Sequence, residues 1–163
     1  MKYDDASWHY GGEFPKGLPR KNGATHIGMF LAWAIERDLA GDLHTKDDAR
    51  MLALVKARKM TGARFLIECC DEKLTNDELN DEGDLFAQEY YEKKYFNDYW
   101  KVFGDEVDSL YEVRDTWTNY DRIKPVLDRR LDAWRRRNGR AKAPAKKRMA
   151  LKKAPPRAPR KKS

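Results

Sequence analysis

Apolar residues recur at three- and four-residue steps along most of the chain, which is the spacing of one helix face. In the segment 25–40 this face holds Ile27, Phe30, Leu31, Ala34 and Ile35. Met29 and Trp33 add apolar bulk elsewhere on the circumference, so the segment is predicted to be a central helix that is buried nearly all round. We expect Thr25 to be its N-cap and Gly41 to follow its last turn.

Further helices are predicted from about Lys46 to Lys59, after Thr61, and from about Asp121 to Arg137. In the last of these, Pro125 is tolerable only in the first turn, because proline has no backbone N–H to donate. The residues Thr75-Asn76-Asp77-Glu78 fit a capping box, which typically stabilises a helix start by about 1 kcal/mol.

The stretch from Leu85 to Phe103 is also helical in its spacing, but its aromatic residues are too dense to share one face. We expect Phe96 and Trp100 to enter the core and some tyrosines to stay at the surface. Exposed tyrosine beside acidic residues suits a protein interface, because it gives contact area at a low cost in side-chain entropy.

Residues 1–24 are interrupted by glycine and proline and are predicted to be irregular, with four anchors on the domain: Trp8, Tyr10, Phe14 and Leu18. No alternating run is long enough to argue for a sheet, and the segment 110–113 fits either a helix or a strand. The sequence therefore predicts an all-α fold, a single compact helical domain of about five to six helices over residues 1–137.

The composition changes at Asn138. From there to Ser163 the chain holds 11 of its 34 Lys and Arg residues and no acid, and Met149 and Leu151 are the only larger apolar residues. Such a segment cannot bury enough surface to offset its ordering entropy, so residues 138–163 are expected to be a disordered tail. The net charge of +7 then divides into a basic tail and a domain of 23 basic and 27 acidic residues, with a net charge of −4.

The cysteine content and the N-terminus predict a cytoplasmic protein. Cys69 and Cys70 are the only cysteines, and neighbouring cysteines rarely form a disulfide. Residues 1–10 contain no apolar signal-peptide core, and the longest apolar run, Gly28 to Ile35, falls well short of the roughly 20 residues that a membrane span needs.

Basic clusters in the tail are typical of segments that neutralise phosphates without recognising a base sequence. The candidate nucleic-acid-binding residues are Lys146, Lys147, Arg148, Lys152, Lys153, Arg160, Lys161 and Lys162. The alternative is a solubilising appendage. No aromatic residue interleaves these charges, so stacking on single-stranded bases is not indicated.

Nine carboxylates and one lysine lie between Asp71 and Glu92. Their offsets do not match a calcium loop. They form either a solvated helix face, favoured near a helix N-terminus, or a negative patch that docks on a basic partner. The candidate partner-binding residues are Asp77, Glu78, Asp81, Glu82 and Asp84, with Tyr90 and Tyr91 as anchors.

The three histidines, His9, His26 and His44, match no short metal-ligand spacing, and neither a metal nor another cofactor is predicted. His9 and His26 would converge if the N-terminal segment folded back over the central helix, and Asp4, Asp5 or Glu13 would then orient an imidazole. That arrangement would be an acid–base site in an enzyme of unknown substrate. Because no nucleophile, phosphate-loop or dinucleotide motif occurs, a binding protein is favoured over an enzyme.

Two sequences near the N-terminus carry a family resemblance: Trp8-His9-Tyr10-Gly11-Gly12 and Gly23-Ala24-Thr25-His26-Ile27-Gly28-Met29-Phe30. With Leu79-Asn80-Asp81-Glu82-Gly83 and Val126-Leu127-Asp128-Arg129-Arg130, they resemble the pattern of an uncharacterised bacterial domain family over residues 1–137. The basic tail lies outside the shared pattern.

Small domains of this kind resemble immunity proteins, which neutralise toxins exchanged between competing bacteria. The resemblance implies a cognate toxin as the partner and occlusion of its active site as the mechanism. An acidic, tyrosine-rich face would suit a nuclease toxin with a basic cleft. The alternatives are a nucleic-acid-associated protein that acts through its tail and an enzyme that uses His9 and His26.

Deletion of residues 138–163 distinguishes the tail from the domain. If the tail binds nucleic acid, the full chain will bind DNA and the truncated chain will not. With about six phosphates neutralised, the affinity of the full chain will fall roughly a thousandfold between 50 and 200 mM salt. Fluorescence anisotropy with a labelled duplex measures both effects, and equal DNA binding by the two chains would exclude the tail as the binding segment.

Overall fold

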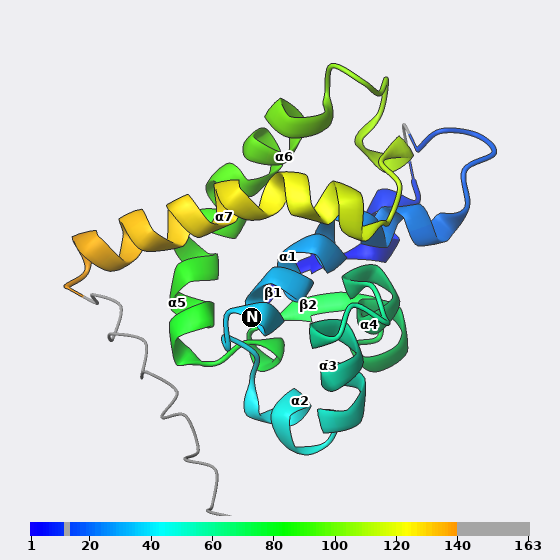
Figure 1. Ribbon diagram of the computed structural model, residues 1–163. Helices are drawn as coiled ribbons and strands as arrows, with labels where there is room; N and C mark the ends of the chain where they lie inside the picture. The colour runs from blue at the N-terminus through cyan, green and yellow to red at the C-terminus, as the bar shows by residue number, and fades with distance from the viewer. Residues whose placement is uncertain (12–13, 140–163) are drawn as a thin grey trace, which may run out of the picture.

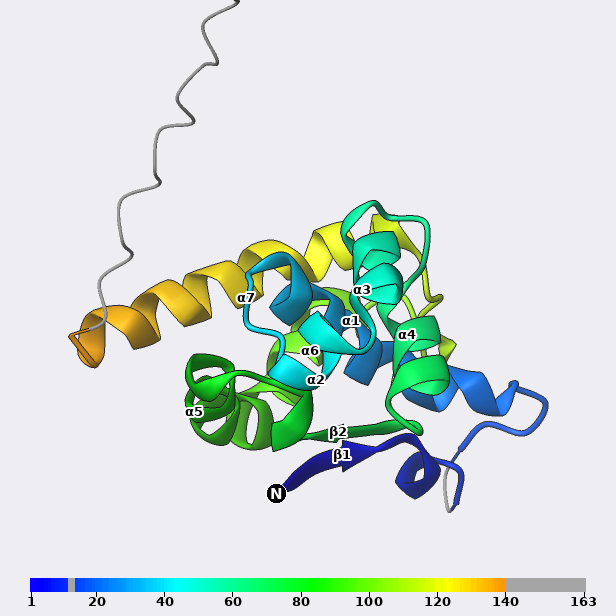
Figure 2. The same cartoon turned by 90° about the horizontal axis from the view of Figure 1, so that it is seen from below.

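The computed structural model describes residues 1–11 and 14–139 (Figures 1 and 2). Its α-helices are α1 (Thr25–Glu36), α2 (Asp42–Lys46), α3 (Ala49–Lys56), α4 (Gly62–Cys69), α5 (Asp81–Tyr90), α6 (Phe96–Phe103) and α7 (Trp117–Arg137). Two strands, β1 (Lys2–Asp5) and β2 (Lys73–Thr75), form an antiparallel pair. Short 3₁₀ turns are η1 (Ala6–His9), η2 (Arg20–Ala24), η3 (Asn76–Glu78) and η5 (Leu110–Glu112), and a π-helical turn, η4 (Tyr91–Tyr95), joins α5 to α6.

Helix α1 lies at the centre, as its apolar circumference predicts. Every residue from Thr25 to Ile35 is buried. Helix α7 crosses one side of α1. Helices α3 and α4 pack on another side, and the segment from α5 to α6 covers the remainder (Figure 1). The β1–β2 ribbon runs along the edge of the helical layer (Figure 2). The expected all-α class and single compact helical domain are confirmed, with this small ribbon as an addition.

Two glycines set the close packing of α1 against α4. A Cβ atom on Gly28 would collide with the backbone of Gly62 and Ala63, and a Cβ atom on Gly62 would collide with the carbonyl of Gly28. The helix backbones therefore touch at this crossing. Thr61 caps α4 by accepting a hydrogen bond from the Arg64 N–H. The cap begins α4 at Gly62, the residue that contacts Gly28.

Several predicted helix boundaries are wrong by a few residues. Thr25 is not the N-cap of α1, because η2 runs directly into the helix and Thr25 is already helical. The predicted helix 46–59 corresponds to the shorter α3, and α2, which ends at Lys46, was not predicted. The capping box at Thr75 is present but starts the three-residue turn η3, and the N-cap of α5 is Asn80.

Helix α7 begins at Trp117, four residues before the predicted start, with Thr116 as its cap. Pro125 consequently lies in the helix interior instead of the first turn. Its ring is exposed. The helix ends at Arg137 as predicted, and residues 140–163 of the predicted tail 138–163 lie outside the described residues.

The N-terminal segment is more regular than predicted. Asp4 and Asp5 pair with Leu74 and Lys73 across the ribbon. The sequence did not reveal the alternating apolar and polar pattern of a strand, because each strand is only three or four residues long. Trp8, one of the four predicted anchors, is 58% exposed.

The aromatic run between α5 and α6 faces the opposite way from the prediction. Phe96 and Trp100 are 37% and 46% exposed, whereas the tyrosines of this run, Tyr90, Tyr91, Tyr95 and Tyr99, are buried. The π-helical turn at Tyr91–Tyr95 adds a residue to the turn, which rotates the following helix and exchanges its inward and outward faces. A period of 3.6 residues carried through the segment cannot anticipate that rotation.

The glycine contact gives a stability prediction. Gly28→Ala will lower the free energy of unfolding by about 3 kcal/mol or more, because the added methyl group meets backbone atoms that cannot rotate away. Gly11→Ala is the matched control: its Cβ would meet open space, and its effect will stay within about 0.5 kcal/mol. Urea unfolding of both variants measures the difference, and similar values for the two would contradict a backbone contact between α1 and α4.

Candidate functional site

Three N-terminal elements bring Asp4, His9 and His26 together. Strand β1 places Asp4 beside the domain through its pairing with β2. Asp5 then caps η1 by accepting a hydrogen bond from the Ser7 N–H (3.0 Å), and this turn returns the chain so that His9 faces Asp4. His26 lies in the first turn of α1. The folding back that the sequence left as an assumption is therefore present.

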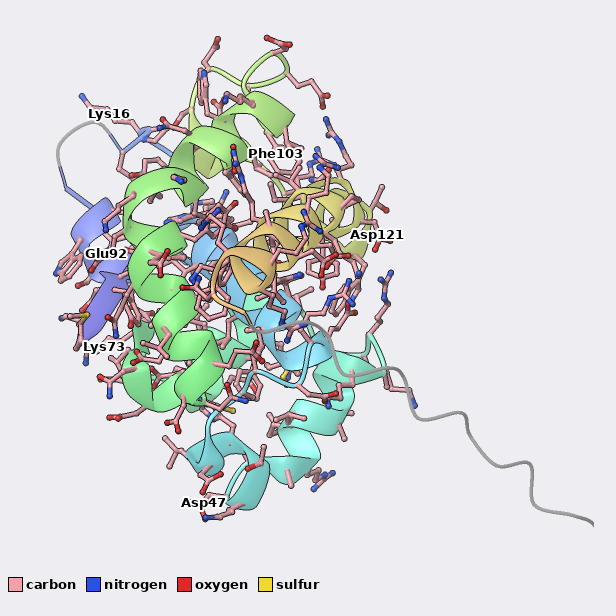
Figure 3. The ribbon with its side chains drawn as sticks, turned by 90° about the vertical axis from the view of Figure 1, so that its left-hand side faces the viewer. Lys16, Asp47, Lys73, Glu92, Phe103 and Asp121 are labelled. Atoms are coloured by element: carbon pink, nitrogen blue, oxygen red, sulfur yellow. The ribbon has the colours of Figure 1, made fainter. Side chains whose placement is uncertain are left out.

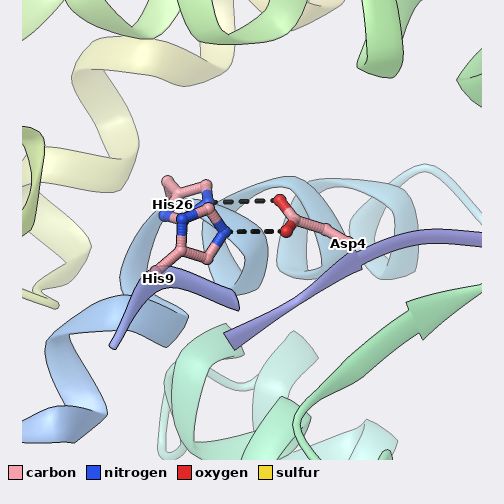
Figure 4. Close-up of side chains that lie close together, drawn as sticks. All are labelled: Asp4, His9 and His26. Atoms are coloured by element: carbon pink, nitrogen blue, oxygen red, sulfur yellow. Dashed lines mark hydrogen bonds and ion pairs between the residues drawn. The ribbon is translucent and has the colours of Figure 1, made fainter. Parts of the chain in front are cut away.

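Both imidazoles bind the same carboxylate (Figure 4). His9 Nε2 lies 2.7 Å from Asp4 Oδ1, and His26 Nε2 lies 3.2 Å from Asp4 Oδ2. The two rings meet edge to face, with 4.6 Å between their centroids. Since the carboxylate accepts at both oxygens, each imidazole donates from Nε2, which leaves Nδ1 of a neutral ring as its basic nitrogen.

Tyrosines from later segments complete this network. Tyr91 donates its hydroxyl to Asp4 Oδ2 (2.6 Å), and Tyr95 donates to the backbone carbonyl of His26 (2.7 Å). The Tyr111 hydroxyl lies 2.9 Å from His9 Nδ1. We call Asp4, His9, His26, Tyr91 and Tyr111 the His–Asp site.

Burial and hydrogen bonding act in opposite directions on the charges of the His–Asp site. Burial alone would raise the pKa of the Asp4 carboxyl, but hydrogen bonds from His26, His9 and Tyr91 hold it well below its usual range. Complete burial lowers the pKa of the His26 imidazole, although the neighbouring Asp4 carboxylate opposes this shift. Asp4 is therefore ionised at neutral pH, and His26 is neutral.

Solvent approaches the His–Asp site from the side of His9. The His9 side chain is 14% exposed, whereas that of His26 is buried beneath Phe96, with 4.8 Å between the ring centroids. Tyr111 lines a groove of about 300 Å³ together with Gly11, Phe14, Asp108, Ser109 and Leu110. That volume is at the lower limit of ligand pockets, so the groove suits a small substrate group.

Two clusters of donor atoms are candidates for holding a metal ion. In the His–Asp site, Asp4, His9 and His26 offer three donors within 4.8 Å of one another. A second cluster of His44, Cys70 and Glu78 meets the same distance and is fully buried. Neither set was indicated by sequence spacing, because each combines residues from three separate segments.

The fold keeps only part of the predicted acidic face together. Asp77 and Asp81 are exposed, but Glu78 is buried in the capping box at Thr75, Glu82 pairs with Arg135 (2.8 Å), and Asp84 accepts a hydrogen bond from Tyr3. The prediction that the anchors Tyr90 and Tyr91 lie at the surface is wrong. Tyr90 donates to the buried Asp98 (3.0 Å), and Tyr91 belongs to the His–Asp site.

The charged side chains are spread over several faces of the domain: Lys73 of β2 and Glu92 of η4 lie on one side, and Asp121 of α7 lies on the opposite side (Figure 3). The predicted nucleic-acid-binding residues, Lys146 to Lys162, lie outside the described residues, as does Glu13. Within the described part, Lys101, Arg129 and Arg136 line a groove between α6 and α7.

Tyr111 is the functional candidate that sequence analysis missed. It lies about 100 residues from His9 along the chain, and no motif links them. The one signal was the ambiguous segment 110–113, which contains the turn η5. Of the three acids proposed to orient an imidazole, Asp4 does so, and Asp5 instead caps η1.

A family model described as "Domain of unknown function (DUF7832)" matches residues 2–113. The chain belongs to this family. The matched part of the DUF7832 domain contains every residue of the His–Asp site and ends before α7. No curated protein matches the chain, and no solved structure matches it. Among the described helices of the domain, none is both long and apolar enough to cross a membrane.

The low pKa of His26 predicts that acid destabilises the domain. Unfolding restores an ordinary imidazole pKa near 6.5. Below that pH, His26 binds a proton in the unfolded chain but not in the folded one. The free energy of unfolding will therefore fall as the pH drops from 6.5 toward the folded pKa, by at most about 1.4 kcal/mol per unit. Asp4 adds nothing in this window, because its carboxyl is ionised in both states.

Urea unfolding at about pH 7.5 and about pH 5.5 measures this loss. His26→Gln retains a polar side chain but removes the titrating ring, so its free energy of unfolding will depend less on pH than that of the unmodified chain. An equal pH dependence in the two proteins would show that His26 is not held neutral.

Proposed function

We propose that the DUF7832 domain is an enzyme in which His9 acts as a general base at the groove beside Tyr111. The observation that carries the proposal is the hydrogen-bonded chain from Tyr111 through His9 to Asp4, with distances of 2.9 and 2.7 Å. It has the arrangement of an activated hydroxyl, a base and an orienting carboxylate that nucleophilic and general-base catalysis use.

Each member has a distinct role in this mechanism. Asp4 fixes the His9 tautomer with the proton on Nε2 and stabilises the imidazolium that forms when Nδ1 accepts a proton. His26 and Tyr91 are positioning residues, because they hold the Asp4 carboxylate without facing the groove. The backbone N–H of Asp5 donates to the same carboxylate (2.8 Å), so its orientation is fixed from several sides.

Tyr111 suits the role of a proton relay better than that of a nucleophile. Burial and the charge of Asp4 raise the pKa of the Tyr111 hydroxyl, so a free phenolate is disfavoured. In a relay, water in the groove gives a proton to the Tyr111 oxygen while the Tyr111 proton passes to His9 Nδ1. The hydroxide equivalent attacks an ester-type carbonyl, and the proton then returns through Tyr111 to the leaving oxygen.

Hydrolysis of p-nitrophenyl acetate, a small ester, tests the proposal. His9→Gln and Tyr111→Phe will each lower the rate by roughly 10²- to 10⁴-fold, the usual contribution of a positioned base. Tyr10→Phe is the matched control, because Tyr10 is a nearby phenol that donates to Glu72 instead of His9. If the His9→Gln protein folds and retains the full rate, the assignment of the base is wrong.

A protein-binding, immunity-type function is the second candidate. It is supported by a surface groove in which the exposed acids Asp77 and Asp81 lie with Asp42, Glu82 and the exposed Leu43. The exposed Leu43 side chain together with several carboxylates suits a basic partner surface, such as the cleft of a nuclease toxin. This face differs from the predicted one in losing Glu78, Asp84, Tyr90 and Tyr91 and gaining Asp42 and Leu43.

Charge reversal tests the second candidate. The double variant Asp77→Lys with Asp81→Lys will weaken binding to a toxic partner captured from native lysate by at least about tenfold. The double variant Glu92→Lys with Asp105→Lys changes the net charge equally at exposed positions elsewhere and will leave the affinity unchanged. Equal affinities for both variants would exclude the acidic groove as the docking face.

A further inference from the structure

The buried cluster of His44, Cys70 and Glu78 has no part in the proposed catalysis. His44 comes from α2, Cys70 follows α4, and Glu78 ends η3, so three segments contribute one donor each. All three residues are buried. Burying an imidazole, a thiol and a carboxylate together is unfavourable unless each has a partner.

The spacing of the donors fits a tetrahedral metal ion. His44 Nε2 lies 3.6 Å from Cys70 Sγ, and the three donor atoms lie within 4.8 Å of one another. Zinc bonds of about 2.3 Å to sulfur and about 2.0–2.1 Å to nitrogen, at a tetrahedral angle, separate the two ligand atoms by about 3.5 Å. A simple S–H···N hydrogen bond also accommodates the distance, but it does not require the third donor, Glu78.

The surroundings of His44 resemble those of a metal ligand. Asp48 Oδ2 lies 2.8 Å from His44 Nδ1, which keeps that nitrogen protonated and directs Nε2 toward Cys70. Carboxylates commonly orient ligating histidines in this way. The Phe65 ring packs edge to face against the imidazole, with 5.0 Å between the centroids, and limits its rotation.

Glu78 is held in place by an independent interaction. Its carboxylate accepts a hydrogen bond from the Thr75 N–H in the capping box, through one oxygen, Oε2. A carboxylate has lone pairs for both a capping bond and a metal ion. With a thiolate and a carboxylate as ligands, a divalent ion makes the buried cluster neutral overall.

We propose that His44, Cys70 and Glu78 bind Zn²⁺ as a three-residue ligand set, with a water molecule as the fourth ligand. Zinc is favoured over magnesium or calcium by the thiolate and imidazole donors. The ion ties α2 to the end of α4 and to η3. The site is separate from the His–Asp site and stands whether or not His9 is a catalytic base.

Cobalt substitution of the full-length protein tests the site directly. The protein is stripped with a chelator and titrated with Co²⁺, which replaces zinc and reports its ligands through its spectrum. One equivalent of Co²⁺ with a thiolate-to-cobalt charge-transfer band and intense tetrahedral bands is expected, followed by loss of both on addition of Zn²⁺. Absence of the charge-transfer band in the unmodified protein overturns the proposal without any variant.

Matched variants then locate the ligands. Cys70→Ser will abolish the charge-transfer band, whereas Cys69→Ser, at the half-buried neighbouring position, will retain it. Asp48→Asn will weaken Zn²⁺ binding by about 10- to 100-fold, the usual effect of losing an orienting partner. Binding that persists in Cys70→Ser and disappears in His9→Gln would assign the metal to the His–Asp site and overturn the proposal.

Discussion

The ionised carboxylate of Asp4 is buried, and a buried charge is stable only if hydrogen bonds replace the water it has lost. This requirement draws distant parts of the chain to one point. His9, His26 and Tyr91 donate to the carboxylate from η1, the start of α1 and η4. The N-terminal segment is thereby fixed on the domain by polar contacts, although Trp8, its largest apolar side chain, is exposed.

The π-helical turn is part of the same arrangement. It rotates the chain so that the Tyr91 hydroxyl binds Asp4 of β1 and the Tyr95 hydroxyl binds the His26 carbonyl of α1. Regular α-helix would separate these two side chains by a different angle around the axis. Phe96 is left at the surface, where its ring covers His26. The turn thus supplies hydrogen-bond donors to the site and apolar cover above it.

The His–Asp site and the cluster of His44, Cys70 and Glu78 share one arrangement but differ in exposure to solvent. Each joins a histidine to a carboxylate that fixes its tautomer, Asp4 for His9 and Asp48 for His44. His9 reaches the groove beside Tyr111 and is suited to exchanging protons with a ligand. His44 is enclosed among Cys70, Glu78 and Phe65, which suits a bound ion instead of a turnover reaction.

The sequence by itself determined the helical class, the central position of α1, the N-cap at Thr61, the capping box at Thr75 and the end of α7 at Arg137. These features depend on side chains within a few residues of one another, so apolar period and cap chemistry specify them. It also predicted that His9 and His26 would converge if the N-terminal segment folded back, with Asp4 as one of three acids that would orient an imidazole. Only the tertiary structure decided that His9 and His26 converge on Asp4, that Tyr91 and Tyr111 join them, and that Tyr90 is buried. Those contacts join residues up to about 100 positions apart, and one π-helical turn exchanged the faces of α6, which no local period records.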